Sequence, residues 1–323
     1  GPACYGRGNT RPTVTDANVF LGRIAADRPL GGGLLQALDA QAAAQAIDVH
    51  VARPLGLSVE AAAEAILTVA NAKMAGAIRV ASIERGHDPR QFAYMPFGGG
   101  GALHVCAMMR EVGVTTGLIP RYPGVTSALG CVMADMRHDA VQTLNQGLKE
   151  LDLALLQQRL SALAQQCQQR LDSAGVRFES VEEIVVLDML YAGQTHTLSV
   201  RIDPAQLTRE RIQQAFEASY QQAFGRVLSG LVIRVLNLRY ARLGIRPKFN
   251  LQVLAPQGAG STQPLGTQRV YHQGRWWEAQ RLDRLALPVG AVVAGPAILE
   301  QPDTTVWLEP GFEARVDDFG NLR

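Results

Sequence analysis

Four consecutive glycines, Gly98 to Gly101, stand between a short apolar segment and a predicted helix in the stretch QFAYMPFGGGGALHVCAMMREV. Glycine allows positive φ angles and a close approach of the backbone to a ligand. A helix N-terminus directly after the glycines presents free N–H groups and a positive dipole end, which favour phosphate or another anion. The spacing matches neither the Rossmann nor the Walker pattern. The stretch therefore predicts either an anion-binding turn or a tight turn without a ligand.

Two titratable residues could act on a ligand held by these glycines. His104 lies on the first turn of the following helix, and histidine exchanges protons near neutral pH. Asp16 follows Thr15 at the start of a predicted helix over residues 17–21, where this pair could simply cap the helix. No H-x-x-H or H-E-x-x-H spacing occurs in the sequence, so the metal ligands are left unknown.

The elements around these residues predict an α/β layer structure. An Ala-rich helix is expected over 34–55, after a second glycine cluster at 31–33, and a long helix from Ser58 to about Glu84 carries one apolar stripe. Apolar segments over 92–97 and 114–119 are expected to be buried strands. Alternation of helices and strands is typical of α/β proteins.

Composition excludes several classes of function. The chain has 323 residues and a net charge of +2, without a Lys/Arg run, which gives no reason to expect nucleic-acid binding. Apolar runs are interrupted before the roughly 18 residues that a membrane span needs. Four cysteines without regular spacing indicate reduced thiols of a cytoplasmic protein. Because the chain opens on Gly-Pro without a Met, we expect a processed product, a split subunit or a fragment.

The second half of the chain lacks chemical motifs but has clear periodicity. Amphipathic helices are expected over 148–171 and 208–224, and strands over 184–191, 197–202 and 232–243. A polar linker over 255–268 leads to short strands. The expected domains are therefore an α/β core over 1–145, an α+β domain over 146–255, and a small β-rich tail over 256–323 packed on that second domain.

Four stretches taken together resemble one family. They are GPACYGRGNTRPTVTDANVFLGR, VANAKMAGAIRVASIERGHDPRQFAYMPFGGGGALH, PRYPGVTSALGCVMADMRHD and GPAILEQPDTTVWLEPGF. They resemble, in collinear order over essentially the whole chain, the hydantoinase A/oxoprolinase family. This family includes ATP-dependent N-methylhydantoinase, 5-oxoprolinase and related subunits of acetone and acetophenone carboxylases.

The resemblance implies an actin-like ATPase core, of which this chain would be the C-terminal part. It implies that Gly98, Gly99, Gly100 and Gly101 contact a nucleotide, with Gly100 and Ala102 where many relatives have Ala and Pro. By the same likeness Asp16 and His104 are candidate catalytic residues, and Tyr122 and Ser127 are candidate substrate-binding residues. The phosphate loops of the family's N-terminal half (Asp-Gly-Gly-Thr type) do not occur in this sequence. Alone, the chain is therefore expected to bind ATP poorly.

The resemblance also implies a reaction and partners. ATP and Mg²⁺ would phosphorylate a carbonyl oxygen of a cyclic amide before ring opening, because phosphorylation turns a poor leaving group into an activated one. The partners implied are the missing N-terminal half, as a separate chain or a removed segment, and a hydantoinase B-type subunit. A subunit of an ATP-dependent ketone carboxylase and a non-catalytic assembly scaffold remain the alternatives.

Overall fold

The computed structural model describes residues 1–27, 37–248, 250–258 and 260–323, so the glycine cluster at 31–33 lies outside the described residues. The chain forms two compact units: Gly1–Cys131 together with Asn250–Arg323, and Val132–Phe249. The sequence predicts that the tail from residue 256 packs on the second domain, but the structure places it in the first unit. The predicted boundary at residue 145 falls inside a strand of the second unit.

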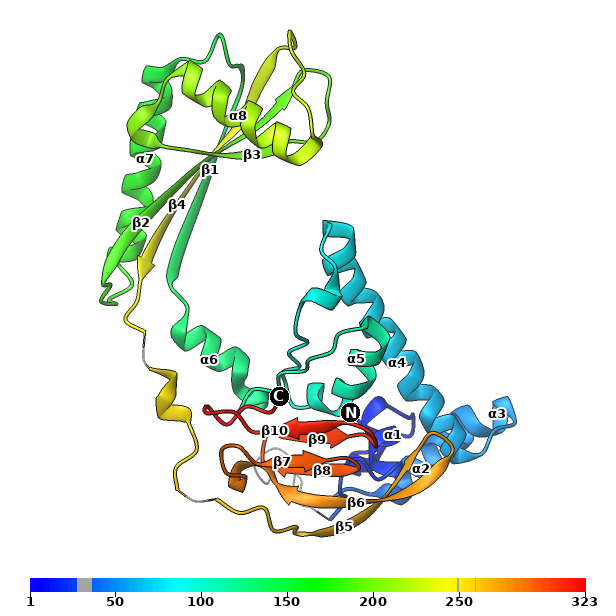
Figure 1. Ribbon diagram of the computed structural model, residues 1–323. Coiled ribbons are helices and arrows are strands. Elements are labelled where there is room, and N and C mark those ends of the chain that lie inside the picture. The colour runs from blue at the N-terminus through cyan, green and yellow to red at the C-terminus, as the bar shows by residue number, and fades with distance from the viewer. Residues whose placement is uncertain (28–36, 249, 259) are drawn as a thin grey trace. The chain divides into compact units, whose positions relative to one another are not determined.

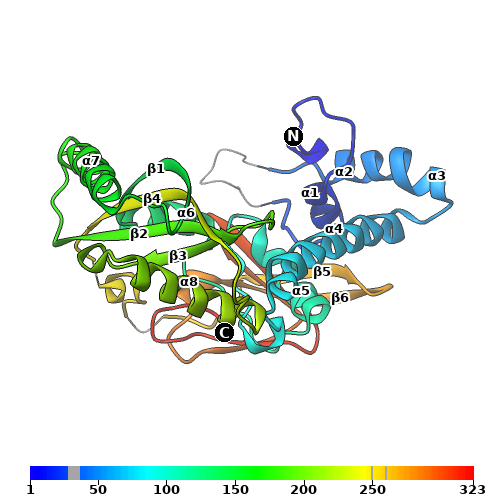
Figure 2. The same ribbon diagram turned by 90° about the horizontal axis from the view of Figure 1, so that it is seen from above.

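The first unit contains six α-helices among its described residues. They are α1 (Val14–Phe20), α2 (Ala40–Ile47), α3 (Arg53–Leu55), α4 (Val59–Ser82), α5 (Val105–Val112) and α6 (Thr126–Met133). The last of them, α6, ends with its final two residues in the second unit. A π-helical turn, Asp48–Ala52, joins α2 to α3, so the described part of the helix expected over 34–55 is confirmed from residue 40. Helix α4 lies against both α1 and α5 (Figure 2). Ser58 caps α4 as predicted, by accepting a hydrogen bond from the Ala61 N–H.

The tail builds two small sheets of the first unit. One contains β5 (Gly266–His272), β6 (Arg275–Asp283), β8 (Ala297–Gln301) and β9 (Thr304–Leu308) in that order, and the other pairs β7 (Val292–Ala294) with β10 (Glu313–Arg315) (Figure 1). Val105 and Cys106 of α5 share a buried cluster with Leu299 and Val306 of the sheet. Burial of these apolar side chains explains why the tail packs on the first unit.

The two buried strands expected beside the glycines are reduced to isolated bridges. Tyr94 forms a parallel bridge with Gly117, and Ile119 forms an antiparallel bridge with Leu322. Gly117 has no side chain to pack in a strand, and a Cβ there would lie 2.9 Å from the Met109 sulfur. Close packing on α5 therefore replaces a longer strand at this position.

The second unit is one antiparallel sheet with two helices. Its strands are β1 (Met136–Gly147), β2 (Ser180–Tyr191), β3 (Leu198–Ile202) and β4 (Ile233–Ile245), in the order β1-β4-β2-β3, and its helices are α7 (Leu153–Asp172) and α8 (Arg209–Phe224) (Figure 1). Apolar residues of both helices form one buried cluster with those of the strands. The expected helices and strands of this region are confirmed, whereas β1 is an additional strand.

One helix among the described residues, Val59–Arg85, is long and apolar enough to cross a membrane by length and composition alone. This finding differs from the expectation that no apolar run suffices. The same helix makes polar contacts within the unit. Glu64 accepts hydrogen bonds from the Gln273 and Gly274 N–H groups, and Asn71 is hydrogen-bonded to His104.

Candidate functional site

The glycine turn exposes two unpaired backbone donors. Gly98 has φ 85° and donates its N–H to the Pro123 carbonyl at 2.7 Å, which fixes the start of the turn. The Gly101 N–H donates to the Gly98 carbonyl. Between them, the N–H groups of Gly99 and Gly100 make no hydrogen bond to any residue that the structure describes. Two adjacent N–H groups without a protein partner are available as donors to an anion.

A pocket of about 340 Å³ opens beside these two glycines. Its lining comes from the N-terminal segment, the glycine turn and the β8–β9 turn: Tyr5, Val14, Thr15, Asn18, Ile24, Gly99, Gly100, Leu103, His104, Pro302, Asp303, Thr304 and Thr305. We call it the glycine pocket. Gly99, Gly100 and His104 of the predicted site residues line it, whereas Gly98 and Gly101 shape the turn without lining the pocket.

The β8–β9 turn holds the glycine turn in place. The Thr304 hydroxyl donates to the Gly99 carbonyl at 2.9 Å, and a Cβ on Gly99 would lie 3.3 Å from the Asp303 carbonyl oxygen. The Asp303 carboxylate accepts from the Gly124 N–H at 2.9 Å. Asp303, Thr304 and Thr305 all line the pocket.

His104 is buried and carries a defined partner. Its Nδ1 lies 2.8 Å from Asn71 Oδ1, so Nδ1 donates and Nε2 is the basic nitrogen in the neutral ring. Burial, and then the positive charge of Arg23, hold the pKa of His104 below its ordinary value. The neutral imidazole is therefore the dominant form at neutral pH, as a proton acceptor requires.

Asp16 is enclosed by the protein's own donors. Its carboxylate accepts from the N–H groups of Ala3, Cys4 and Thr13 at 3.1, 2.7 and 2.8 Å and from the Thr13 hydroxyl at 2.7 Å. Burial alone would raise its pKa, but the hydrogen bonds from Cys4, Thr13 and Ala3 hold the pKa below its ordinary value. Thr13, rather than the predicted Thr15–Asp16 pair, is the cap of α1, with Asp16 completing a capping box. This geometry favours a positioning role for Asp16 over the predicted catalytic role.

Asn18 is a pocket residue that the sequence did not single out. Its Nδ2 donates to the Val14 carbonyl at 3.0 Å, which orients the amide, and its Oδ1 is buried without a hydrogen-bond partner among the described residues. A buried acceptor without a partner costs free energy, which a donor group on a ligand would recover. One signal was available, because a polar side chain in the first turns of a short helix beside Asp16 can face the same pocket.

Tyr122 and Ser127 lie outside the glycine pocket. The Tyr122 hydroxyl accepts from Arg121 Nε at 3.3 Å, and Ser127 is exposed on α6. The loop that carries Tyr122 reaches the site only through its backbone, where Pro123 and Gly124 contact Gly98 and Asp303. The substrate-binding role of Tyr122 and Ser127 stays a prediction.

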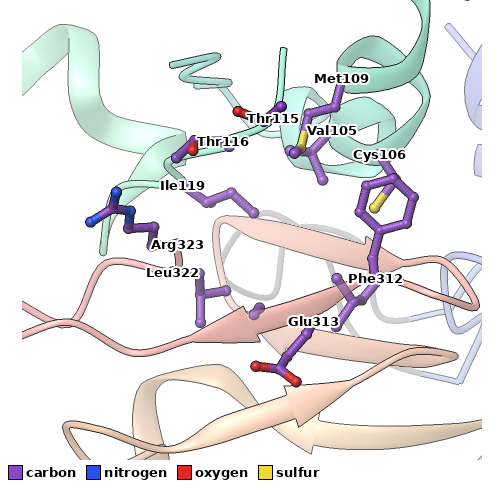
Figure 3. A pocket seen from close by; sticks show the side chains of 13 residues that line it. Val105, Cys106, Met109, Thr115, Thr116, Ile119, Phe312, Glu313, Leu322 and Arg323 are labelled. Carbon is purple, nitrogen blue, oxygen red and sulfur yellow. The ribbon is translucent and has the colours of Figure 1, made fainter. Parts of the chain in front are cut away.

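Another cavity of the first unit, about 240 Å³ in volume, is lined mainly by apolar side chains. Figure 3 shows Val105, Cys106 and Met109 of α5 with Phe312 nearby, while the charged ends of Glu313 and Arg323 point away from these apolar groups. Burial raises the pKa of the Cys106 thiol to about 12, so the reactive thiolate is not populated at neutral pH. This cavity therefore offers packing space, and its cysteine is not a reactive thiolate.

Matches to family models identify the class of protein. The model described as hydantoinase/oxoprolinase matches residues 1–140, and the model described as the hydantoinase/oxoprolinase C-terminal domain matches residues 145–322. The chain belongs to the hydantoinase/oxoprolinase family, as the sequence resemblance predicts.

Individual relatives support the same assignment. The caprolactamase α subunit of Pseudomonas jessenii is 33% identical over 328 residues, covering 98% of this chain and 47% of the relative. The crystal structure of ATP-dependent caprolactamase from the same organism has a TM-score of 0.76 and 31% identity, and the match covers 100% of this chain and 48% of that one. A nucleotide-free structure of acetone carboxylase has a TM-score of 0.79 and 26% identity, with coverage of 100% and 48%. These similarities confirm the α/β fold class, and the chain spans about half of the length of the relatives it matches.

Proposed function

We propose that this chain is part of an ATP-dependent enzyme and that the glycine pocket forms one wall of its nucleotide site. The observation that carries the proposal is the pair of unpaired N–H groups at Gly99 and Gly100, which line a pocket in a chain of this family. The free Asn18 Oδ1 adds an acceptor for an amino or hydroxyl group of the ligand. A ligand with both acceptor and donor groups, as a nucleotide has, fits this combination.

The reaction that we propose is ATP-dependent opening of a cyclic amide. The caprolactamase relative is named for activity on a lactam, and it is the relative with 33% identity over nearly the whole chain. ATP would supply the phosphoryl group that activates the carbonyl oxygen. In this chain the Gly99 and Gly100 N–H groups would orient the bound nucleotide. Neutral His104, with its tautomer fixed by Asn71, would accept a proton at Nε2.

The proposal includes groups that this chain does not provide. We infer a partner region with the phosphate loops and a hydantoinase B-type subunit, in a cytoplasmic complex, and Mg²⁺ bound with the phosphates. Among the described residues no three His, Cys, Asp or Glu side chains are grouped as metal ligands, and we assign no Mg²⁺ ligand to this chain.

A ketone carboxylase subunit is the second candidate, because the acetone carboxylase structure matches the whole chain with a TM-score of 0.79. Two assays on the assembled enzyme separate the candidates. Consumption of ATP that depends on a lactam, hydantoin or oxoproline supports the hydrolase, whereas consumption that depends on bicarbonate together with a ketone supports the carboxylase.

The nucleotide-wall assignment is tested with Gly100→Val in the assembled protein. No heavy atom lies within 4 Å of a Cβ at Gly100, so the fold has room for the side chain while the pocket loses volume. We expect ATP turnover and nucleotide binding to fall at least about tenfold, the equivalent of 1.4 kcal/mol. Gly76→Val on α4 is the matched control, because a Cβ there also meets no atom within 4 Å. Unchanged nucleotide binding in a folded Gly100→Val variant would sink the assignment and leave an assembly scaffold as the better description.

A further inference from the structure

A second polar cavity, about 230 Å³ in volume, is lined by Asn71, the hydrogen-bond partner of His104. Side chains of α4, α5, the end of β5 and the segment after β9 line it, and the ones that matter here are Arg23, Asn71, Arg110, His272 and Glu309. We call it the Arg23 cavity. None of these residues belongs to the predicted site, and only Asn71, through its hydrogen bond to His104, enters the proposed function.

Arg23 is a buried cation with too few partners. It is only 5% exposed, and among the described residues its one hydrogen-bond contact is a long one, from Nη2 to His272 Nδ1 at 3.5 Å. Its Cζ also lies 6.0 Å from the centroid of the Trp307 ring, a contact that uses no N–H donor. Its Nε is buried without a partner, and no carboxylate of the described residues lies within 4 Å of the guanidinium. A guanidinium carries five N–H donors, so most of its hydrogen-bonding capacity is unused. Burial of a charge without acceptors is costly.

Three carboxylates line the cavity, and two of them, Glu309 and Glu64, are engaged elsewhere, while Glu111 is exposed and forms no ion pair with Arg23 among the described residues. Glu309, with a side chain only 3% exposed, forms an ion pair with Arg110 and lies 3.6 Å from His272 Nε2. Both oxygens of Glu64 accept from backbone N–H groups of the β5–β6 turn. The anionic groups at this cavity therefore do not satisfy the donors of Arg23.

Asn71 adds a second donor to the same cavity. Its Oδ1 accepts from His104, and its amide nitrogen makes no hydrogen bond within the described residues. The side chain lines the Arg23 cavity. A ligand with oxygen acceptors could therefore reach Arg23 and the Asn71 amide together. Such a ligand would also fix the amide that holds His104 in the glycine pocket.

We propose that the Arg23 cavity binds a small planar oxyanion, a carboxylate or bicarbonate, through the Arg23 guanidinium and the Asn71 amide. A planar guanidinium matches the two oxygens of a carboxyl group, and charge-assisted hydrogen bonds of this kind are the strong ones. The inference concerns a cavity distinct from the glycine pocket, so it can fail while the proposed function stands.

Isothermal titration calorimetry of the intact protein with acetate, bicarbonate and inorganic phosphate tests the proposal. We expect acetate or bicarbonate to bind with a Kd on the order of 1 mM and phosphate to bind more weakly. Arg23→Gln should weaken binding at least about tenfold, whereas Arg85→Gln, at an exposed arginine, should leave it unchanged. Asn71→Asp retains an acceptor for His104 but places negative charge in the cavity, and should weaken binding by a similar factor.

Three results would overturn the proposal. The first is the absence of binding for all three anions to the wild type, which would mean that water alone fills the cavity. The second is tighter binding of phosphate than of the planar anions. The third is equal affinity in the wild type, Arg23→Gln and Asn71→Asp. If Arg23→Gln does not fold, Asn71→Asp decides, because its side chain keeps the size of the native residue.

Discussion

His104 Nδ1 lies 2.8 Å from Asn71 Oδ1, so a histidine of the glycine pocket is held by a side chain that lines the neighbouring cavity. The bond joins α4 to the turn that follows the glycines. Asn71 fixes the tautomer, and the buried surroundings of His104 fix its charge. One hydrogen bond thus couples the position of α4 to the proton-accepting atom of the pocket.

We predict that His104 makes the protein less stable in acid. Burial and the Arg23 charge lower the pKa of His104 in the folded state, so below about pH 6.5 the unfolded chain binds protons first. The free energy of unfolding should therefore fall as the pH drops from 6.5 toward the lower folded pKa. Urea unfolding between about pH 5 and pH 8 should show a smaller fall in His104→Gln.

His272 contributes in the same direction, because burial also lowers its pKa. The double variant His104→Gln/His272→Gln should therefore flatten the profile further. His87→Gln, at an exposed histidine, is the control. Identical pH profiles for His104→Gln and the wild type would contradict the prediction.

Asp16 should contribute more to the free energy of unfolding than Asp39, an exposed aspartate that caps α2. In Asp16→Asn an NH₂ group, which cannot accept a hydrogen bond, replaces one of the two oxygens that accept from these donors. We therefore expect Asp16→Asn to lower the free energy of unfolding by about 2–4 kcal/mol. Asp39→Asn is the control, because within the described residues Asp39 accepts a hydrogen bond only from the Ala42 N–H at the start of α2, and Asn caps a helix as well as Asp does. Urea unfolding at neutral pH measures both.

The lowered pKa of Asp16 also predicts how its contribution to the free energy of unfolding changes with pH. Its folded pKa lies below the ordinary value of 3.8, so its contribution to stability is present above that value and is lost only as the pH falls through the folded pKa. Equal losses of stability in Asp16→Asn and Asp39→Asn would refute the positioning role.

Local patterns were enough to predict most helices and strands of the second unit. The apolar spacing of α7 and α8 and the alternation in β2 and β3 are properties of single segments, which the sequence shows directly. β1 was missed because polar His138 and Gln142 occupy its less exposed positions and apolar Val141 is exposed, so apolar and polar residues do not alternate along it. The glycine turn and His104 were identified from their neighbours in the chain.

Features that depend on distant segments could not be predicted. The packing of the tail on α5 joins Cys106 to Trp307, whose carbonyl accepts from the Cys106 thiol across 201 positions of the sequence. The isolation of Arg23 and the free Oδ1 of Asn18 are relations between atoms that only the folded chain brings together. The role of Asp16 was similarly undetermined, because an aspartate at this position can be either a helix cap or a catalytic carboxylate, and the sequence does not distinguish the two.

Arg284 should be essential for the loop that leads to the glycine pocket. It is 4% exposed and donates to the carbonyls of Ile119, Pro120 and Arg121 and to Gln301 Oε1. Burial lowers its pKa to about 10, so the guanidinium stays charged at neutral pH. Lysine cannot reproduce a planar donor to several carbonyls, and we expect Arg284→Lys to lower the free energy of unfolding by about 2–4 kcal/mol.

The consequence reaches the pocket, because the same loop continues to Gly124, whose N–H is bound by Asp303. Hydrogen exchange of residues 119–124 should accelerate in Arg284→Lys, while α7 in the second unit keeps the protection of the wild type. Arg85→Lys, at an exposed position, should change neither. If residues 119–124 exchange no faster in Arg284→Lys, the hydrogen bonds from Arg284 to the loop carbonyls do not order this loop. The hydrogen bond between the Gly124 N–H and Asp303 would then be the contact that orders it.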